Sequence, residues 1–396
     1  MKYDFTTTID RRSRSAAKWL GMDAELPNLE AGIIPFSVAD LDMPIAPEIK
    51  ERLSAYLSAD GCFGYTSPSE EFYRAVVNWM KKRHDWQIEK EWIVNTAGVM
   101  HAVNIVINEF SEEGEGVILF SPVYHPFFMA IKENKRQVVD CPLIDDNGNY
   151  YIDWPNFERV AQNDKNRVLI FCSPHNPVGR VWEKEELSKV ISICQQNNIL
   201  LLTDEIHADF AMPTHHHYPI AKIAVDSSVQ LITCTAPSKS FNLAGLQLSN
   251  IIIEDSDLRE RFESRQRRSG VESLNCFSYK ACELAYDYGE AWLDELIALV
   301  YSNYQMVVAY LNEHWPAVRI FPLQGTYLLW LDWGTVEIPN RNIIDFIIKE
   351  AKVFVTKGDK FSEGCSNFMR LQLAAPSKDL QEALERIRRA LAQYGK

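Results

Sequence analysis

Four residues that could do chemistry follow short apolar runs typical of buried strands. They come where each run ends: Tyr124 after 116–120, Asn176 after 167–172, Asp204 after 199–203 and Lys239 after 229–234. Because the carboxyl ends of parallel strands meet at one edge of a sheet, and ligands bind beyond that edge, we expect these side chains to share one site. An aromatic ring, an amide, a carboxylate and a lysine would then face one ligand.

The apolar runs alternate with amphipathic stretches along most of the chain. Besides the four runs above, a run lies at 249–253, and helical patterns cover 69–83, 98–110, 184–197 and 257–267. Short apolar runs between helices predict crossover connections and a parallel sheet that is buried on both faces. We therefore expect an α/β fold with a mostly parallel sheet flanked by helices.

The pattern changes after about residue 290. Helical patterns lie at 291–314, 343–350 and 378–393, and short strand patterns lie at 325–331 and 368–373. This order predicts a smaller α+β domain. We expect a large domain over 46–288 and a small domain that combines 1–45 with 289–396.

Composition narrows the class of protein. The chain has 396 residues, 46% of them hydrophobic, and a net charge of −13, which is typical of a globular protein. Nucleic acids and anionic lipids bind basic surfaces, so the acidic balance disfavours both as partners. The uncharged run 117–131 is too short to span a bilayer, and no apolar signal segment precedes Arg11. We expect a cytoplasmic protein.

The groups at the predicted strand ends suit pyridoxal 5'-phosphate (PLP). This cofactor needs a lysine for a covalent imine, an acid at its pyridine nitrogen, an aromatic face on its ring and donors for its phosphate. Ala97, Gly98 and Val99 open the predicted helix 98–110, whose N-terminal N–H groups and dipole can bind a phosphate. Each residue taken alone has an ordinary alternative: a surface lysine, a capping aspartate, a turn asparagine or a core tyrosine.

Five segments carry a resemblance to a known family. They are Ser37–Met43, Phe63–Thr66, Pro174–Trp182, Asp204–Asp209 and Ser238–Asn242. With them the chain resembles, over nearly its whole length, fold-type I PLP-dependent enzymes of the class I/II aminotransferase family. Within that family it is most similar to the MalY/PatB-type cystathionine β-lyase (C–S lyase) branch. The string Asp-Glu-Ile-His-Ala-Asp is specific to this branch, because general aminotransferases usually have tyrosine where this chain has His207.

The resemblance implies a role for each matching residue at the cofactor ring. Lys239 would carry the cofactor covalently and act as the catalytic base, and Asp204 would pair with the protonated pyridine nitrogen. Asn176 would bind the 3′ oxygen of the ring and Tyr124 would stack on it. His207 lies where the family places another donor to the 3′ oxygen, and the alternative for it is a satisfied polar residue of the sheet.

Further residues would serve the phosphate. Ala97, Gly98 and Val99 would bind it at the predicted helix N-terminus, and Ser238 would add a hydroxyl. Tyr65 matches a tyrosine that reaches the phosphate from the neighbouring subunit, which implies a homodimer.

The substrate would be held at the other side of the ring. Arg370 matches the arginine that binds the α-carboxylate of an amino acid, and Asn176 and Ala39 would be further substrate contacts. The segment 322–327 also resembles the branch, and we expect it to line the same pocket.

The chain departs from the wider aminotransferase pattern at two positions. Many aminotransferases have a phosphate-binding arginine eight residues after the lysine, where this chain has Gln247, and a serine three residues before it, where this chain has Ala236. The phosphate site is therefore less cationic than usual. These departures disfavour a generic transaminase.

The implied activity is that of a PLP-dependent C–S β-lyase that cleaves L-cystathionine or related S-substituted cysteines to pyruvate, ammonia and a thiol. The alternative is an aminotransferase of the same fold. A third hypothesis is a regulator that binds a transcription factor, as some relatives of the branch do, although no sequence feature marks such a surface.

A run of three histidines, His215 to His217, resembles a metal cluster at first sight. Adjacent side chains in an extended chain alternate sides, so three in a row seldom converge on one ion. We therefore expect a loop here and no metal site.

Overall fold

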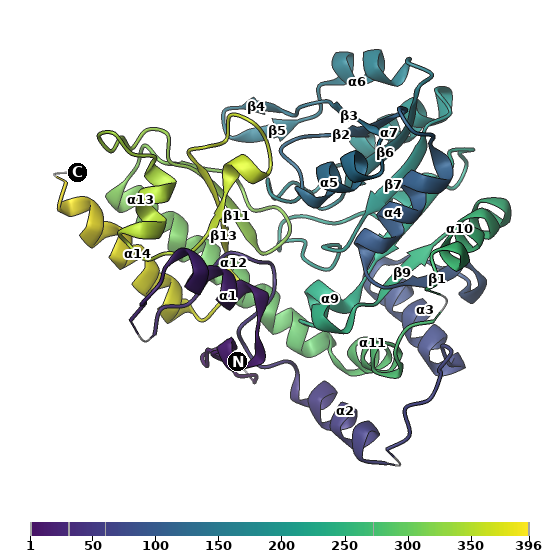
Figure 1. Ribbon diagram of the computed structural model, residues 1–396, viewed down its shortest axis with the longest axis horizontal. Helices are drawn as coiled ribbons and strands as arrows, with labels where there is room; N and C mark the ends of the chain where they lie inside the picture. The colour runs from purple at the N-terminus through teal and green to yellow at the C-terminus, as the bar shows by residue number, and fades with distance from the viewer. Residues whose placement is uncertain (1, 31, 60, 272, 395–396) are drawn as a thin grey trace.

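A seven-stranded sheet forms the core of the larger part of the computed structural model, which describes residues 2–30, 32–59, 61–271 and 273–394 (Figure 1). The strands are ordered β1-β9-β8-β7-β6-β2-β3. They are β1 (Ile93–Thr96), β2 (Gly116–Leu119), β3 (Gln137–Asp140), β6 (Asn166–Cys172), β7 (Leu200–Asp204), β8 (Leu231–Thr235) and β9 (Ser249–Ile252). The order confirms the predicted α/β class.

The sheet is parallel from β3 through β8, whereas β9 is antiparallel to both of its neighbours. The run at 249–253 does not extend the parallel pattern because no crossover helix precedes it. The connection from β8 holds only the short turns α9 (Pro237–Ser240) and η3 (Ala244–Leu246). These turns lie at the edge of the sheet where the candidate site residues gather.

Successive side chains of the central strands enter two different apolar cores. Ile118 and Leu169 belong to one core, and their neighbours Val117 and Ile170 belong to the other, as the two-residue period of a strand requires. One face is covered by α4 (Val99–Phe110), α5 (Pro126–Glu133) and α10 (Ser256–Arg268), and the other by α6 (Trp154–Ala161), α7 (Lys184–Gln196) and α8 (Ile220–Ile223). This double coverage fixes the strand ends from both sides.

A four-stranded antiparallel sheet forms the second part, in the order β10-β11-β13-β12. Its strands are β10 (Arg319–Ile320), β11 (Leu328–Asp332), β12 (Thr356–Lys357) and β13 (Phe368–Gln372), and its helices are α12 (Glu290–His314), α13 (Ile343–Lys349) and α14 (Ser377–Ala392). This sheet agrees with the α+β pattern expected after residue 290.

The N-terminal segment joins this second sheet. Phe36 donates its backbone N–H to Phe354 at 2.7 Å and accepts from Gln372 at 3.2 Å. Figure 1 shows α1 (Ala17–Glu25) beside the C-terminal elements. These contacts support the assignment of the first residues to the small domain, and the boundaries 46–288, 1–45 and 289–396 stay predictions.

Several further elements complete the fold and were not predicted. They are η1 (Arg12–Arg14), α2 (Pro47–Ala59), η2 (Lys90–Trp92), the hairpin of β4 (Ile144–Asp146) and β5 (Asn149–Tyr151), α11 (Cys276–Tyr288) and η4 (Gly358–Lys360). The predicted pattern at 69–83 corresponds to α3 (Glu70–His84). Within the described residues, no helix is both long enough and apolar enough to cross a membrane.

Candidate functional site

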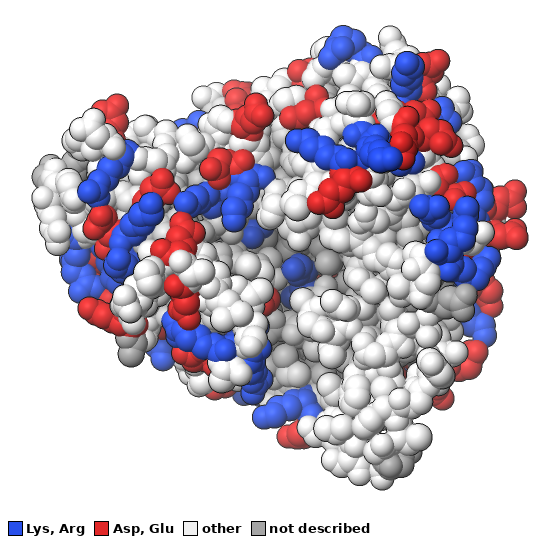
Figure 2. Space-filling model, viewed as in Figure 1, with Lys and Arg blue, Asp and Glu red and all other residues white. Residues whose placement is uncertain are grey.

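A cavity of about 610 Å³ lies where the carboxyl ends of β6, β7 and β8 approach β13 and the N-terminal segment. Figure 2 shows a hollow at the centre of the drawn face, with lysine or arginine atoms inside it. The structure brings the predicted site residues to this cavity, with one exception. Those that line it are Ala39, Ala97, Gly98, Val99, Tyr124, Asn176, Asp204, His207, Ser238, Lys239 and Arg370.

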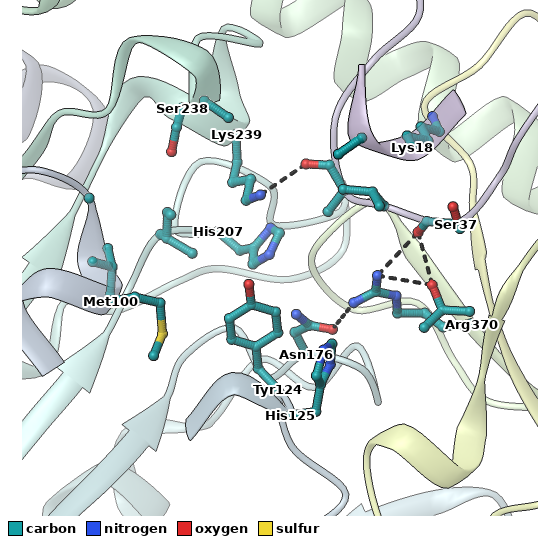
Figure 3. A pocket seen from close by; sticks show the side chains of 18 of the residues that line it. Lys18, Ser37, Met100, Tyr124, His125, Asn176, His207, Ser238, Lys239 and Arg370 are labelled. Carbon is teal, nitrogen blue, oxygen red and sulfur yellow. Dashed lines mark hydrogen bonds between the residues drawn. The ribbon is translucent and has the colours of Figure 1, made fainter. Parts of the chain in front are cut away.

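Lys239 lies in α9, directly after β8, and points into the cavity (Figure 3). Its Nζ donates to the backbone carbonyl of Ala39 at 2.9 Å. The pKa of Lys239 is lowered to about 8, first by burial and then by the positive charge of Arg370, while the carboxylates of Asp40 and Asp204 oppose the shift. A lysine with this pKa has a usable neutral fraction near pH 7, which a base or a nucleophile needs.

Asp204 ends β7 and is buried at the floor of the cavity. Its Oδ1 accepts the backbone N–H of Ile206 at 3.1 Å, which is the local turn contact that the capping alternative predicts. Burial raises the pKa of Asp204 to about 6, while this hydrogen bond and Lys239 act in the opposite direction. A protonated ring nitrogen in the cavity would supply the positive partner that a buried carboxylate needs.

His207 lies nearby, with its ring edge-on to that of Tyr327 at 5.7 Å between centroids. Burial, with the charges of Lys239 and Arg370, lowers its pKa well below the usual value, so the ring is neutral. Its Nδ1 is buried and has no hydrogen-bond partner in the described part of the chain. This nitrogen is therefore available to a ligand in the cavity.

Arg370 comes from β13 and is only 4% exposed. Its guanidinium donates to Asn176 Oδ1 at 2.9 Å and to the carbonyl of Ser37 at 3.1 Å, with a longer contact of 3.4 Å to Thr356 Oγ1. Burial lowers the pKa of Arg370 to about 10, and no carboxylate is among its hydrogen-bond partners in the described residues. A cation in this state is suited to a carboxylate ligand.

The opposite end of the cavity is built from backbone and hydroxyl donors. Gly98 has φ +88, a conformation that favours glycine, and it directly precedes α4. Since the first N–H groups of a helix have no partners inside the helix, this end can bind an anion. Ser238, Gln247 and Ser249 line the same end, and none of them carries a charge.

Tyr124 and His125 form part of the wall between these two ends. Figure 3 shows both side chains near Asn176, with the Tyr124 ring directed into the cavity. The pKa of His125 is lowered to about 4, mainly by burial and also by the charges of Lys360 and Arg370. The sequence analysis missed His125, although its place directly after Tyr124 was a signal that could have identified it.

Buried polar atoms without partners gather in this cavity. In the described residues they include Ser37 Oγ, His125 Nδ1, His207 Nδ1, Ser249 Oγ and Arg370 Nε. Leaving such groups unpaired is costly, so their concentration here indicates a polar ligand. A ligand with a phosphate, a ring nitrogen and a hydroxyl group on the ring fits this set of donors and acceptors, and PLP has all three.

Tyr65 is the exception among the predicted site residues. It lies in the extended segment 61–68 that follows α2, and it is fully exposed, at 107% of its reference area. It does not line the cavity of its own chain.

One other sequence-based expectation needs correction. The segment 322–327 does not line the cavity: Gln324 accepts the backbone N–H of Val181, and Tyr327 donates to the carbonyl of Ala39 at 2.9 Å. These contacts hold other segments of the chain in place.

The histidine run lies in a loop, as predicted. Within it His217 is buried and contacts Glu205 Oε2 at 2.8 Å.

The comparisons with known proteins agree with this geometry. The family model for aminotransferase class I and II matches residues 31–387, so the chain belongs to this family. It is 36% identical to cystathionine beta-lyase PatB of Bacillus subtilis, over 91% of this chain and 92% of the relative.

Two solved structures have the same fold. Cystalysin from Treponema denticola, which contains a pyridoxal 5'-phosphate cofactor, superposes with a TM-score of 0.95 at 41% identity and full coverage of both chains. The PLP-bound C–S lyase from Staphylococcus hominis superposes with a TM-score of 0.89 at 30% identity, over 99% of this chain and 98% of the other. The predicted resemblance to the C–S lyase branch is confirmed.

Proposed function

We propose that the chain is a PLP-dependent C–S β-lyase that cleaves L-cystathionine or related S-substituted cysteines. The observation that carries this proposal is the meeting of Lys239, Asp204, Asn176 and Arg370 in one cavity. They come from four separate segments, and each supplies a different group. The names of PatB and of the Staphylococcus enzyme support the class of reaction.

Bound PLP supplies an electron-withdrawing ring that makes the Cα proton of an amino acid acidic. Asp204 would hold the positive charge of the ring nitrogen, Asn176 would bind the 3′ oxygen, and the ring of Tyr124 would pack against the cofactor. The N-terminus of α4 with Ser238 would bind the phosphate. Lys239 would hold the resting cofactor covalently, and its free amine would take the Cα proton of the substrate.

Arg370 binds the α-carboxylate of the substrate and so fixes Cα relative to Lys239. Once the Cα proton has moved to Lys239, the Cβ–S bond breaks and the thiolate leaves. The remaining three-carbon fragment takes up water and ends as pyruvate and ammonia. With L-cystathionine, the thiol product is homocysteine.

The alternative, an aminotransferase, uses the same residues up to the removal of the Cα proton. Two features favour the lyase. His207 occupies the position where general aminotransferases have tyrosine, and Gln247 lies where many of them have a phosphate-binding arginine. The similarity to PatB at 36% identity points the same way.

Product analysis separates the two activities. Purified protein with L-cystathionine should release pyruvate and homocysteine in equal amounts without added keto acid. Lys239→Ala is the matched negative control. Conversion that depends on an added keto acid, with no thiol released, would instead identify an aminotransferase.

We propose further that the active form is a homodimer in which Tyr65 contacts the phosphate in the partner's site. The helix α2 and segment 61–68 extend away from the two sheets at the lower edge of Figure 1. They expose Leu57, Phe63 and Tyr65, and the surface drawn at this edge in Figure 2 is largely uncharged. Large exposed apolar groups of this kind are typical of an interaction surface.

Mixed dimers test the shared site. Tyr65→Phe and Lys239→Ala chains each damage a different half of a site, so a mixed dimer retains one intact site. Mixing should restore activity above the sum of the separate preparations. An active species that sediments as a monomer would contradict the dimer proposal and leave the lyase proposal standing.

A further inference from the structure

The loop 37–42 brings two backbone carbonyls to the two cations of the site. The carbonyl of Ala39 accepts from Lys239 Nζ at 2.9 Å, and the carbonyl of Ser37 accepts from Arg370 at 3.1 Å. Figure 3 shows both contacts on one side of the cavity. The position of this loop therefore sets where the amine of Lys239 and the guanidinium of Arg370 point.

Lys18, in α1, holds this loop. Its Nζ lies 2.7 Å from Asp42 Oδ2, 3.0 Å from the carbonyl of Asp40 and 2.7 Å from Gln372 Oε1. An ammonium has three N–H donors, so these three acceptors use all of them. Although Lys18 lines the cavity and is 2% exposed, it has no donor left for a ligand. It acts on the loop and not on the substrate.

The charges around Lys18 are balanced. Arg11 contacts Asp42 at 2.6 Å and Asp40 at 2.9 Å, so two cations face two carboxylates. Trp19 adds a hydrogen bond to Asp42 Oδ1 at 2.8 Å. Burial lowers the pKa of Lys18, and the neighbouring carboxylates act against this shift.

A buried cluster of charges contributes little net stability to a fold. Removing charges from water costs several kcal/mol per ion, and apolar residues of similar volume often stabilise a fold equally well. The cluster does join three segments that are far apart in the sequence. Lys18 and Gln372 are separated by 354 positions, and Gln372 is two residues from Arg370 on β13. These contacts therefore fix the relative positions of the segments near the site.

We propose that Lys18 is a positioning residue for proton transfer: it fixes the loop 37–42 so that the Ala39 carbonyl orients the released amine of Lys239 towards the substrate Cα. The same loop holds Arg370 through Ser37, so the proton acceptor Lys239 and the carboxylate-binding Arg370 keep a fixed relative position. This inference rests on the proposed function only in that Lys239 removes a Cα proton; it does not depend on the breaking of a C–S bond.

Deuterium exchange of L-alanine in D₂O isolates this proton transfer. Lys239 takes the Cα proton, and a deuteron from solvent replaces it, while alanine has no leaving group to lose. Proton NMR follows the loss of the Cα signal. In Lys18→Met we expect the exchange rate to fall at least ~10-fold, with normal cofactor content. The pKa of the visible absorbance band of the resting protein should rise, because a nearby cation is lost.

Arg136→Met is the matched control, because Arg136 is also a buried cation but contacts Ser111 and Asn134, away from the cavity. It should lower the melting temperature and leave both the exchange rate and the absorbance titration unchanged. If Lys18→Met exchanges alanine at the wild-type rate and its absorbance titration is unchanged, the proposal is wrong.

A double variant separates positioning from stability. Lys18→Met with Asp42→Leu removes one charge of each sign and leaves the pair of Arg11 and Asp40. It should melt at or above the temperature of Lys18→Met and still exchange alanine at least ~10-fold slower than wild type. Recovery of the wild-type rate in the double variant would show that an unpaired charge, and not loop position, caused the defect.

The wild-type protein distinguishes this proposal from the proposed function. Exchange of the alanine proton without pyruvate release from L-cystathionine would contradict the lyase and leave the role of Lys18 intact.

Discussion

The cavity has two walls of different construction. Asp204, Asn176 and Lys239 follow the ends of neighbouring parallel strands that are buried on both faces. Arg370 comes from a small antiparallel sheet, and its partner Ser37 is 333 positions away in the chain. The strand-end wall is rigid because a packed sheet fixes its residues, whereas the second wall depends on long-range contacts through one loop.

The two walls are therefore suited to different tasks. The groups that we propose touch the cofactor ring need fixed positions throughout the reaction, and the parallel strand ends provide them. Of the groups that we propose bind the substrate, Arg370 and Ala39 lie on the small sheet and the N-terminal loop, and Asn176 lies on the first wall. Variants of the first wall should therefore reduce the chemical step. On the second wall, variants of Arg370 should mainly change substrate binding, whereas variants that displace the loop 37–42 should also slow proton transfer.

The largest effect should come from Lys239. Lys239→Ala removes both the covalent link to the cofactor and the proton acceptor, so lyase activity should fall at least ~10³-fold. Borohydride reduction of the wild-type protein, followed by peptide mass mapping, should place the cofactor on the peptide that contains Ser238, Lys239 and Ser240. An adduct on Lys222 or Lys280 would show that the strand-end wall is not the cofactor wall.

Asp204→Ala should act next most strongly and on the same wall. Without the carboxylate, the ring nitrogen loses its charged partner and Cα loses most of its acidity. We expect kcat to fall at least ~10²-fold, which corresponds to about 3 kcal/mol, while some cofactor remains bound. A kcat close to that of the wild type would mean that the ring nitrogen lies elsewhere.

The second wall should respond through KM. Arg370→Lys keeps the positive charge but loses the paired N–H geometry, so KM for L-cystathionine should rise about 10-fold. The absorbance of the resting protein should stay normal, because Arg370 is placed on the substrate side. An unchanged KM would move the carboxylate site away from β13.

The strand-end wall could be predicted from sequence because its residues lie at fixed places in local patterns. Asp204 and Asn176 follow apolar runs that correspond to β7 and β6, and the rule that ligands bind beyond parallel strand ends brings them together. The second wall offered no such rule. Arg370 and Ala39 were named by resemblance alone, and Lys18 was not named, since nothing local joins it to Gln372.

Two features of the structure differ from what the sequence suggested, because both depend on how the chain packs. The orientation of β9 depends on how the chain turns through α9 and η3, which the apolar pattern of 249–253 does not record. The segment 322–327 resembles the branch, but Tyr327 supports the Ala39 carbonyl from behind rather than contacting the cavity. The resemblance indicated that this segment lies near the site, but its contact with Ala39 depends on packing that the sequence does not show.

The smallest effect should come from the phosphate end, where the chain lacks the arginine that many aminotransferases have. Gln247 lines the cavity in a left-handed conformation, with φ +53, and arginine at this position has a similar backbone preference. Because a helix N-terminus and hydroxyls would already bind the phosphate, Gln247→Arg should add only about 0.5–1 kcal/mol, or a two- to fivefold slower release of cofactor. Release can be followed by the loss of visible absorbance after dilution. Gln196→Arg, at an exposed position on α7, makes the same charge change and should leave release unaltered. If Gln247→Arg alters KM for L-cystathionine and not cofactor release, the end of the cavity near Gly98 binds the substrate and not the phosphate.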